Sequence, residues 1–323
     1  MASMMRVSKF LLMCGALLAP LAAQADTNYP TRPITIIVPF PTGGSTDPFA
    51  RLIGQKLSDS VGQSVIIDNR PGANALIGTE VARRAPADGY TLLFTASTHV
   101  INPLLMPEIP YGPKDFEPVS LLVRSDFVMV THPSVPAKTL KDFIAYASKN
   151  PGKLNYATSG PGNPNHLAGE HFKRLTGIDM MDVPYKGGGP AINDLIGGQV
   201  DVMFSVPTSV AAHIQNGRLN ALAYTGDKPF LGLRIPSFEQ AGLPGFSINS
   251  WNGILVPAGT PKPIIEKLSA EIKKILETQE VKTMLAAQGQ EPWYKGPADF
   301  AAMLQSDHEK YGSIIKTANI KIK

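Results

Sequence analysis

The stretch from Ile34 to Leu57 constrains the fold more than any other part of this sequence. Ile34 to Val38 is a short apolar run rich in β-branched residues, which predicts a buried strand. Pro39 to Asp47 follows with two prolines, two glycines and three hydroxyl side chains, which indicates a tight loop. The pattern therefore predicts a strand that ends in a glycine-containing turn.

A helix is expected directly after this turn. Pro48 suits the first helical position because its missing N–H would have no partner there in any case, and Asp47 is the expected N-cap. Apolar residues at helical spacing predict a buried stripe of Phe49, Ile53 and Leu57. The unpaired N–H groups of a first turn, together with the helix dipole, favour an anion. The spacing matches neither the phosphate loop nor the dinucleotide fingerprint, so an ordinary turn is the alternative.

A second unit of the same kind lies in the middle of the chain. Leu154 to Thr158 predicts a strand, Ser159 to Asn165 predicts a turn rich in glycine and amide residues, and His166 to Leu175 predicts a helix with Asn165 as its N-cap. Neither turn contains Lys or Arg. Two such units in one chain make a ligand site more plausible than either unit does alone.

Strands and helices alternate along most of the chain, which predicts an α/β fold with mostly parallel sheets and helices on both faces. Ligands in such sheets bind beyond the carboxyl ends of the strands. The two alternating halves predict two similar domains, and the helical C-terminal part is expected to pack on the back of the first one. Further strands are expected at 64–68, 91–95, 119–130 with a break at 124–126, 181–185, 199–205, 219–225 and 253–257. Further helices are expected at 75–84, 139–148, 191–196, 209–216, 263–276, 280–288 and 298–318.

The N-terminal segment predicts a signal peptide of residues 1–25 and export to the periplasm. Arg6 and Lys9 precede an apolar core that is too short to span a membrane, and Ala23-Gln24-Ala25 is a small-x-small cleavage site. The only cysteine of the chain, Cys14, lies inside this segment. The mature protein would therefore have no thiol for catalysis or for a metal.

Charge and motifs exclude several other classes of protein. The formal net charge is +4, and the predicted leader carries two of the basic residues, so too little positive charge remains for a nucleic-acid-binding protein. No nucleophile-elbow serine and no zinc-protease helix motif occurs in the mature chain. His166 and His171 are five residues apart and so do not share a helix face. We expect a monomer with no catalytic residues, no metal and no cofactor.

Several long segments resemble the Bug-type solute receptors of tripartite tricarboxylate transporters. They occur in the order of that family and cover nearly all of the mature chain, as YPTRPITIIVPFPTGGSTDPFAR, IIDNRPGANALIG, PADGYTLLF, YATSGPGNPNHLAGEHF, VPYKGGGPAINDLIGGQVDVMF and ILVPAGTP. The resemblance implies a type II periplasmic binding protein fold, with two lobes joined by two crossing strands near 128–130 and 253–256. Lobe 1 would comprise residues 26–127 plus 255–323, and lobe 2 would comprise residues 128–254.

The same resemblance implies capture of a small organic anion, namely a mono-, di- or aromatic carboxylate, between the two lobes. The ligand would be delivered to the membrane permease subunits of a tripartite tricarboxylate transporter. The alternative is a periplasmic sensor that presents its ligand-bound form to a membrane histidine kinase. In this family, backbone amides and hydroxyls of the two helix-starting loops hold the carboxylate, often with waters and without a basic side chain.

The positions that match the family pattern give a set of candidate ligand-binding residues. The first loop contributes Phe40, Thr42, Gly43, Gly44, Ser45, Thr46 and Asp47. The second loop contributes Thr158, Ser159, Gly160, Gly162, Asn163 and His166. Other strand ends contribute the weaker candidates Ser97, Tyr185 and Ser205. Thr42 stands where a glycine is common and Asn163 where a hydroxyl residue is frequent, so the polar contacts and the ligand stay open.

Four of these features have a second interpretation. Asp47 as an N-cap would fix the loop instead of contacting the ligand. His166 either donates to a carboxylate or only packs, and Phe40 is either a wall of the site or part of the core. Gly187 to Gly189 either forms an anion nest or is a plain turn before Pro190.

Overall fold

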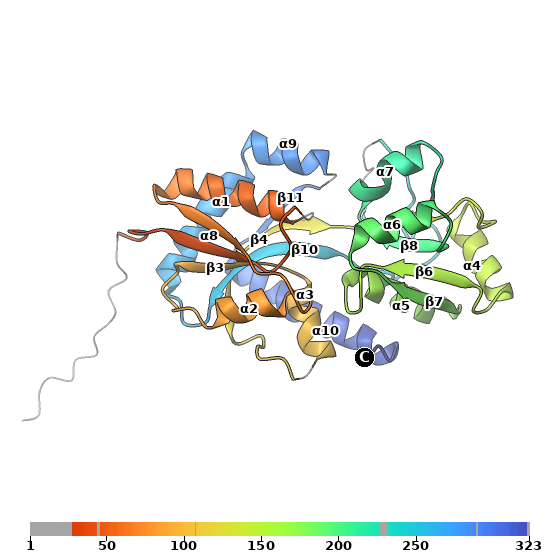
Figure 1. Ribbon diagram of the computed structural model, residues 1–323, viewed down its shortest axis with the longest axis horizontal. Coiled ribbons are helices and arrows are strands. Elements are labelled where there is room, and N and C mark those ends of the chain that lie inside the picture. Colours follow the sequence, from red (N-terminus) through yellow and green to blue (C-terminus); the bar gives the residue numbers. More distant parts are fainter. Residues whose placement is uncertain (1–27, 44–45, 107, 227–231, 289, 322–323) are drawn as a thin grey trace, which may run out of the picture.

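The computed structural model describes residues 28–43, 46–106, 108–226, 232–288 and 290–321. Two β-sheets lie side by side along the long axis of the molecule, each with helices packed against it (Figure 1). The predicted signal peptide of residues 1–25 lies outside the described residues. Within the described part of the chain, no helix is both long enough and apolar enough to cross a bilayer.

The first sheet has the strand order β11-β4-β10-β3-β1-β2. β1 pairs in parallel with β2 and β3, whereas β10 runs antiparallel to β3 and β4. Its strands are β1 (Ile34–Val38), β2 (Val65–Asn69), β3 (Thr91–Ala96), β4 (Phe116–Ser125), β10 (Ser250–Pro257) and β11 (Pro292–Lys295). The associated helices are α1 (Asp47–Val61), α2 (Leu76–Arg83), α3 (Thr98–Leu105), α8 (Lys262–Leu276), α9 (Gln279–Ala287) and α10 (Pro297–Thr317).

The second sheet has the strand order β7-β6-β8-β5-β9. Like the first sheet, it combines parallel and antiparallel pairings. β6 pairs in parallel with β7 and β8, and β5 runs antiparallel to β8 and β9. Both sheets are therefore mixed, and the prediction of mostly parallel sheets was wrong, because the strands that follow each crossing enter antiparallel. Its strands are β5 (Val128–Thr131), β6 (Leu154–Thr158), β7 (Met180–Pro184), β8 (Val202–Ser205) and β9 (Asn220–Tyr224). The associated helices are α4 (Leu140–Lys149), α5 (Pro164–Thr176), α6 (Gly188–Ile196) and α7 (Pro207–Gln215).

The chain passes between the two sheets twice, and the two connections touch. The outward connection is Asp126 and Phe127, between β4 and β5, and the return runs from Thr225 to the start of β10. The N–H of Phe127 donates to Oγ1 of Thr225 at 2.8 Å, and the N–H of Thr225 donates to the carbonyl of Phe127 at 2.9 Å. The sequence placed these connections at 128–130 and 253–256. Those residues instead belong to strands β5 and β10. Hydropathy shows an apolar run but does not show where its pairing partner changes.

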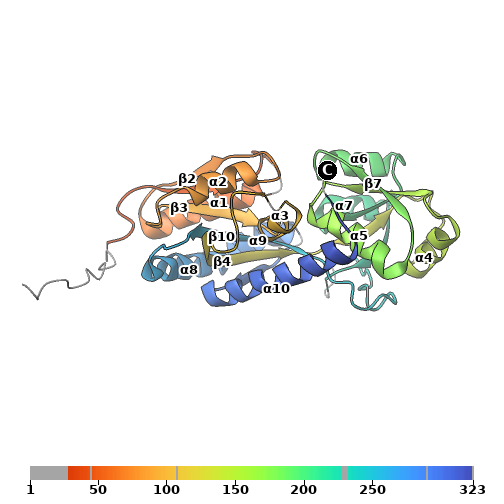
Figure 2. The same ribbon diagram turned by 90° about the horizontal axis from the view of Figure 1, so that it is seen from below.

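Apolar residues at helical spacing form the faces with which the helices pack into the core. Phe49, Ile53 and Leu57 of α1 are buried, as the sequence predicted. The long helix α10 buries Phe300, Tyr311 and Ile314. It contacts β4 and α3 beside the first sheet and also reaches α5 beside the second (Figure 2). The tail therefore packs on the first sheet, as the sequence predicted, and in addition contacts the second.

The two expected N-caps were wrong by one and two residues. Thr46 caps α1, and Asp47 is its first helical residue; Asn163 caps α5, and Asn165 lies in its first turn. In both cases the polar side chain bonds to the preceding loop, and that tertiary contact is not visible in the local pattern.

Two elements were missed in the sequence. α3 contains Pro103, which in a sequence indicates a helix break. β11 has four residues and pairs with β4 in an irregular register. A strand this short carries too little alternation to be recognised.

Candidate ligand-binding site

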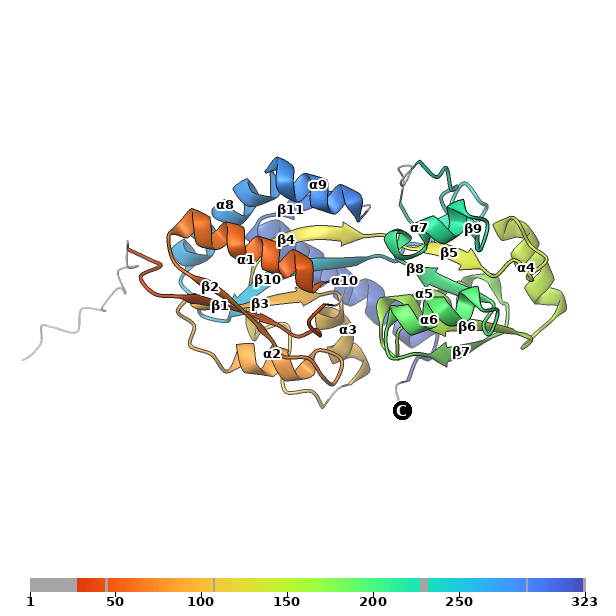
Figure 3. The same ribbon diagram turned by 45° about the horizontal axis from the view of Figure 1, so that its top comes forward.

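A cavity of about 880 Å³ lies between the two sheets and is lined from both sides. α1 lies on one side of it, and α6 and α7 lie on the other (Figure 3). Five helices contribute their N-cap residues to its lining, which are Thr46 of α1, Ala75 of α2, Asn163 of α5, Gly187 of α6 and Val206 of α7. None of these five N-caps makes a side-chain hydrogen bond to its own helix. In these five helices, therefore, no N-cap side chain occupies the backbone N–H groups of the first turn.

Hydroxyl, amide and apolar side chains make up most of the lining that the structure describes. Among the described residues, its lining contains no Lys, Arg, Asp or Glu, and His213 is the only titratable group there. The polar lining side chains are hydroxyls and amides, including Ser205, Asn193, Asn252 and Gln290. The positive ends of the helix dipoles are therefore the main source of electrostatic attraction in this cavity, and they favour an anion.

The side chain of Asp47 fixes the loop between β1 and α1 through hydrogen bonds. Its carboxylate is buried and accepts hydrogen bonds from the N–H of Gly43 and from Arg51 Nε, both at 3.0 Å, and from Asn69 Nδ2 at 2.9 Å. Burial alone would raise the pKa of Asp47, but these hydrogen bonds outweigh it and hold the pKa below its usual value. Asn69 also donates to the carbonyl of Phe40 at 3.2 Å. These contacts favour the loop-fixing role of Asp47.

Asn165 fixes the second loop in a comparable way. Its Oδ1 accepts from the N–H of Ser159 at 3.2 Å, and its Nδ2 donates to Oγ of Ser159 at 3.0 Å. The buried ring of His166 accepts at Nδ1 from the N–H of Gly162 at 3.3 Å, which assigns the ring proton to Nε2. Nε2 lies 3.8 Å from Oδ2 of Asp182. Burial lowers the pKa of His166 and raises that of Asp182, so it favours the neutral form of each group.

Comparison with known proteins decides the family. A family model described as the tripartite tricarboxylate transporter family receptor matches residues 49–320. The chain belongs to this family. The receptor is 36% identical to protein BugT of Bordetella pertussis over 304 residues, which is 93% of each chain.

Two solved structures, each with an organic acid bound, are similar to the receptor over most of its length. It is 34% identical to an R. palustris protein solved with adipate, with a TM-score of 0.81 over 91% of the receptor and 99% of that chain. It is 30% identical to MatC from Rhodopseudomonas palustris with bound malate, with a TM-score of 0.77 over 89% of the receptor and 100% of that chain. These likenesses confirm the two-lobed α/β fold and the prediction of a solute-binding protein that is not an enzyme.

The candidate residues of the receptor fall into three groups. The cavity lining contains Phe40, Thr46, Ser159, Asn163 and Ser205. Gly44 and Ser45 lie outside the described residues. The remaining candidates lie in the same loops or strand ends without lining the cavity, and these are Thr42, Gly43, Asp47, Ser97, Thr158, Gly160, Gly162, His166 and Tyr185.

Several candidates outside the lining make structural contacts in the receptor. Oγ of Ser97 lies 2.9 Å from Oγ of Ser250, which does line the cavity. The hydroxyl of Tyr185 donates to Oδ2 of Asp194 at 2.7 Å. Thr158 is fully buried at the end of β6. Their binding roles stay predictions.

The lining also contains polar residues that sequence reasoning did not single out. Asn74 and Thr98 lie in segments that follow β2 and β3, so the rule about strand carboxyl ends was a usable signal for them. The others come from β4, α6, α7, β10 and the segment after α9, and they are Ser125, Asn193, Thr208, Ser209, His213, Ser250, Asn252, Gln288 and Gln290. The residues after α9 reach the cavity because the C-terminal helices return to the first sheet. The sequence predicted that return but not which residues it brings to the cavity.

Proposed function

We propose that this receptor binds a small organic anion, a mono-, di- or aromatic carboxylate, in the cavity between its two sheets. The observation that carries the proposal is the convergence of five helix N-caps on a cavity in whose lining the described residues include no Lys, Arg, Asp or Glu. The positive ends of helix dipoles attract a carboxylate, and backbone N–H groups at helix N-termini can donate to it. The adipate and malate of two solved relatives support the same ligand class.

We further propose that the two lobes close over this anion. Lobe 1 would be the first sheet with its helices, which includes all of β10, and lobe 2 would be the second sheet with its helices. The N-termini of α1 and α2 belong to the first lobe and those of α5, α6 and α7 to the second, so a ligand between them interacts with both. Binding that needs both lobes favours the closed arrangement. A dicarboxylate has one charged end for each lobe.

Delivery to the permease subunits of a tripartite tricarboxylate transporter in the periplasm completes the proposal. It rests on membership of the receptor family. Deleting the permease genes while keeping the receptor tests it. Transport predicts loss of uptake of the bound acid, whereas the sensor alternative predicts normal uptake and a lost transcriptional response.

The binding step is tested with a variant that fills the cavity without disturbing the fold. Gly189 lines the cavity in the first turn of α6, and no atom lies within 4 Å of where its Cβ would stand. We expect Gly189→Val to weaken carboxylate binding at least tenfold in isothermal titration calorimetry. Ala212→Val is the matched control because Ala212 is exposed on the neighbouring helix α7 and does not line the cavity.

The ligand class is found by a thermal-shift screen of refolded, ligand-free protein against mono-, di- and tricarboxylates, aromatic acids and neutral compounds. A ligand at a hundred times its Kd stabilises the folded state by about 2.7 kcal/mol, which raises Tm by about 5 °C in a chain of this size. A shift with neutral compounds alone, or equal affinity of the Gly189→Val variant and the parent protein, would contradict the proposed site.

A further inference from the structure

A second cavity, of about 390 Å³, lies on the other side of α3 from the first. Thr98 lines the main cavity, whereas the next residue, His99, lines this one together with Val100 and Pro103. The opposite wall comes from α10, which packs against α3 (Figure 2). The remaining wall comes from the segment before β4, from the first residues of β4 and from Leu255 of β10. The established family match assigns no role to this cavity.

The walls of the second cavity are mostly apolar and stiff. Three of the lining residues are prolines, whose backbone has little freedom. The apolar lining residues are Val100, Pro103, Pro113, Phe116, Pro118, Leu255, Ala301 and Leu304. An apolar wall with a few polar groups, at a volume of a few hundred Å³, is typical of small-molecule sites.

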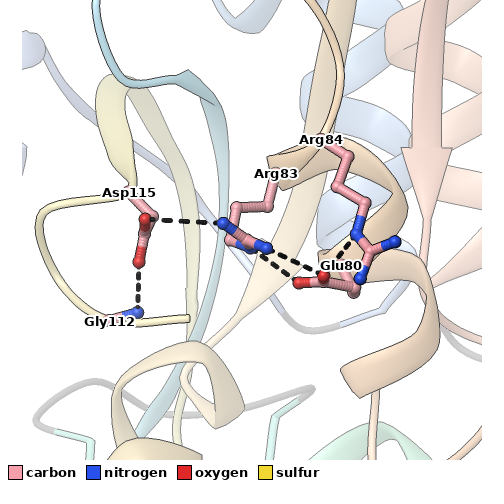
Figure 4. A network of polar contacts seen from close by, with 5 residues as sticks. All are labelled: Glu80, Arg83, Arg84, Gly112 and Asp115. Carbon is pink, nitrogen blue, oxygen red and sulfur yellow. Dashed lines mark hydrogen bonds and ion pairs between the residues drawn. The ribbon is translucent and has the colours of Figure 1, made fainter. Parts of the chain in front are cut away.

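The rim of this cavity is held by a network of ion pairs and hydrogen bonds (Figure 4). The N–H of Gly112 donates to Oδ2 of Asp115 at 2.6 Å, which closes the turn that carries Pro113 and Lys114. Arg83 Nη1 lies 4.0 Å from Oδ1 of Asp115, and its Nε and Nη2 donate to Glu80 at 2.7 and 2.9 Å. The turn is thereby tied to α2, so the cavity does not depend on an unsupported loop.

His99 is the polar group with no assigned role in this cavity. It is 6% exposed, and its ring stacks on Tyr111 and meets Phe116 edge-on, with centroid distances of 5.2 Å in each case. Its Nδ1 is buried without a hydrogen-bond partner among the described residues, and the same is true of Nδ1 of His308 across the cavity. A buried polar atom without a partner is costly, so such atoms in native proteins usually serve a purpose.

The charges around the cavity favour a neutral ligand. Lys114 and Glu117 are both exposed, and they are the charged residues in its lining within the described chain, so their charges cancel. Burial lowers the pKa of His99 to about 4, so the ring is neutral at pH 7. A neutral imidazole offers one donor and one acceptor, which suits a hydroxyl or a carbonyl group better than an ion.

From these features we propose that the cavity between α3 and α10 binds a small neutral molecule with an apolar ring and one hydroxyl or carbonyl group. The ring would lie among the proline, leucine and phenylalanine side chains. The oxygen would bond to the imidazole of His99. This site is separate from the carboxylate site and does not depend on it.

The test titrates the mature protein with phenol as the probe. Changes in NMR chemical shifts show whether binding is saturable and give the affinity. Ala301→Trp fills the cavity from an exposed position of α10, and Ala302→Trp is the matched control because Ala302 is also exposed on α10 but does not line the cavity. We expect phenol affinity to fall at least tenfold in Ala301→Trp and to be unchanged in Ala302→Trp.

A second variant tests the hydrogen bond. His99→Phe keeps an aromatic ring between Tyr111 and Phe116 but removes both nitrogens. The parent protein should prefer phenol to toluene at least fivefold, and this variant should lose the preference. The proposal is overturned if phenol does not bind the parent protein saturably, if the two tryptophan variants weaken binding equally, or if His99→Phe keeps the preference.

Discussion

At the scale of single residues, Asp47 links the stability of the receptor to the shape of its first loop. Replacing it by alanine leaves the N–H of Gly43 and the amide of Asn69 without this acceptor. We expect Asp47→Ala to lower the free energy of unfolding by about 2 kcal/mol and to weaken ligand binding. Urea denaturation and calorimetry measure the two effects.

Asp59 offers the comparison for that substitution. It lies on the same helix α1 but is exposed. Asp59→Ala should leave both measurements nearly unchanged. If Asp47→Ala binds ligand as the parent does, the carboxylate has no part in shaping the loop.

His99 predicts a pH dependence of stability. Burial lowers its pKa to about 4, against the ordinary value of 6.5. Between these two pH values the unfolded chain binds the proton and the folded chain does not, so stability rises with pH across that window. Lowering the pH from 7 to 4 should cost about 3 kcal/mol through this residue.

The measurement is urea denaturation across that pH window for the parent and for His99→Gln. The variant should show the weaker pH dependence of the two. If the free energy of unfolding changed with pH equally in both proteins, the ring of His99 would be protonated inside the folded protein.

At the scale of secondary-structure elements, much of the fold was predictable because single strands and helices carry their own periodicity. β1 and β6 have the bounds that the sequence indicated. The N-caps were not predictable to the residue, since Asp47 and Asn165 bond to loops rather than to their own helix ends. Of the five N-termini at the cavity, the sequence pointed clearly to those of α1 and α5. The other three required knowledge of how the helices are arranged in space.

Helix α5 depends on a glycine at its contact with β6. A Cβ on Gly169 would stand 2.2 Å from Cε2 of Tyr156, whose side chain is fully buried. We expect Gly169→Ala to destabilise the protein by about 1–3 kcal/mol, because the ring has no space into which to move. Thermal or urea unfolding measures the loss.

Gly189→Ala is the comparison within the neighbouring helix α6. Its Cβ would meet nothing within 4 Å, so the helical preference of alanine should leave stability unchanged or raise it by up to about 1 kcal/mol. Equal losses for the two alanine variants would refute the steric argument.

At the scale of the whole molecule, the two connections between the sheets form a single hydrogen-bonded unit. Oγ1 of Thr225 accepts the N–H of Phe127, so one hydroxyl joins the outward chain to the returning chain. Thr225→Val keeps the shape of the side chain but removes the acceptor. We expect the amide of Phe127 to exchange with solvent deuterium at least tenfold faster, with a stability loss of about 1 kcal/mol.

Thr225→Ser keeps the hydroxyl and should protect the Phe127 amide as the parent does. Unchanged exchange in Thr225→Val would show that the neighbouring backbone bonds hold the two connections together without this hydroxyl.

The lining of the cavity between the sheets also affects how the ligand specificity of a duplicated gene can change. The groups proposed to attract the anion belong to the main chain, which a point mutation does not replace, whereas the described walls consist mainly of hydroxyl, amide and apolar side chains. Substitutions in the walls alter the size and shape of the acid that fits, while recognition of its charge persists. A duplicated copy of this gene can therefore acquire a new substrate in small steps, each of which still encodes a working receptor.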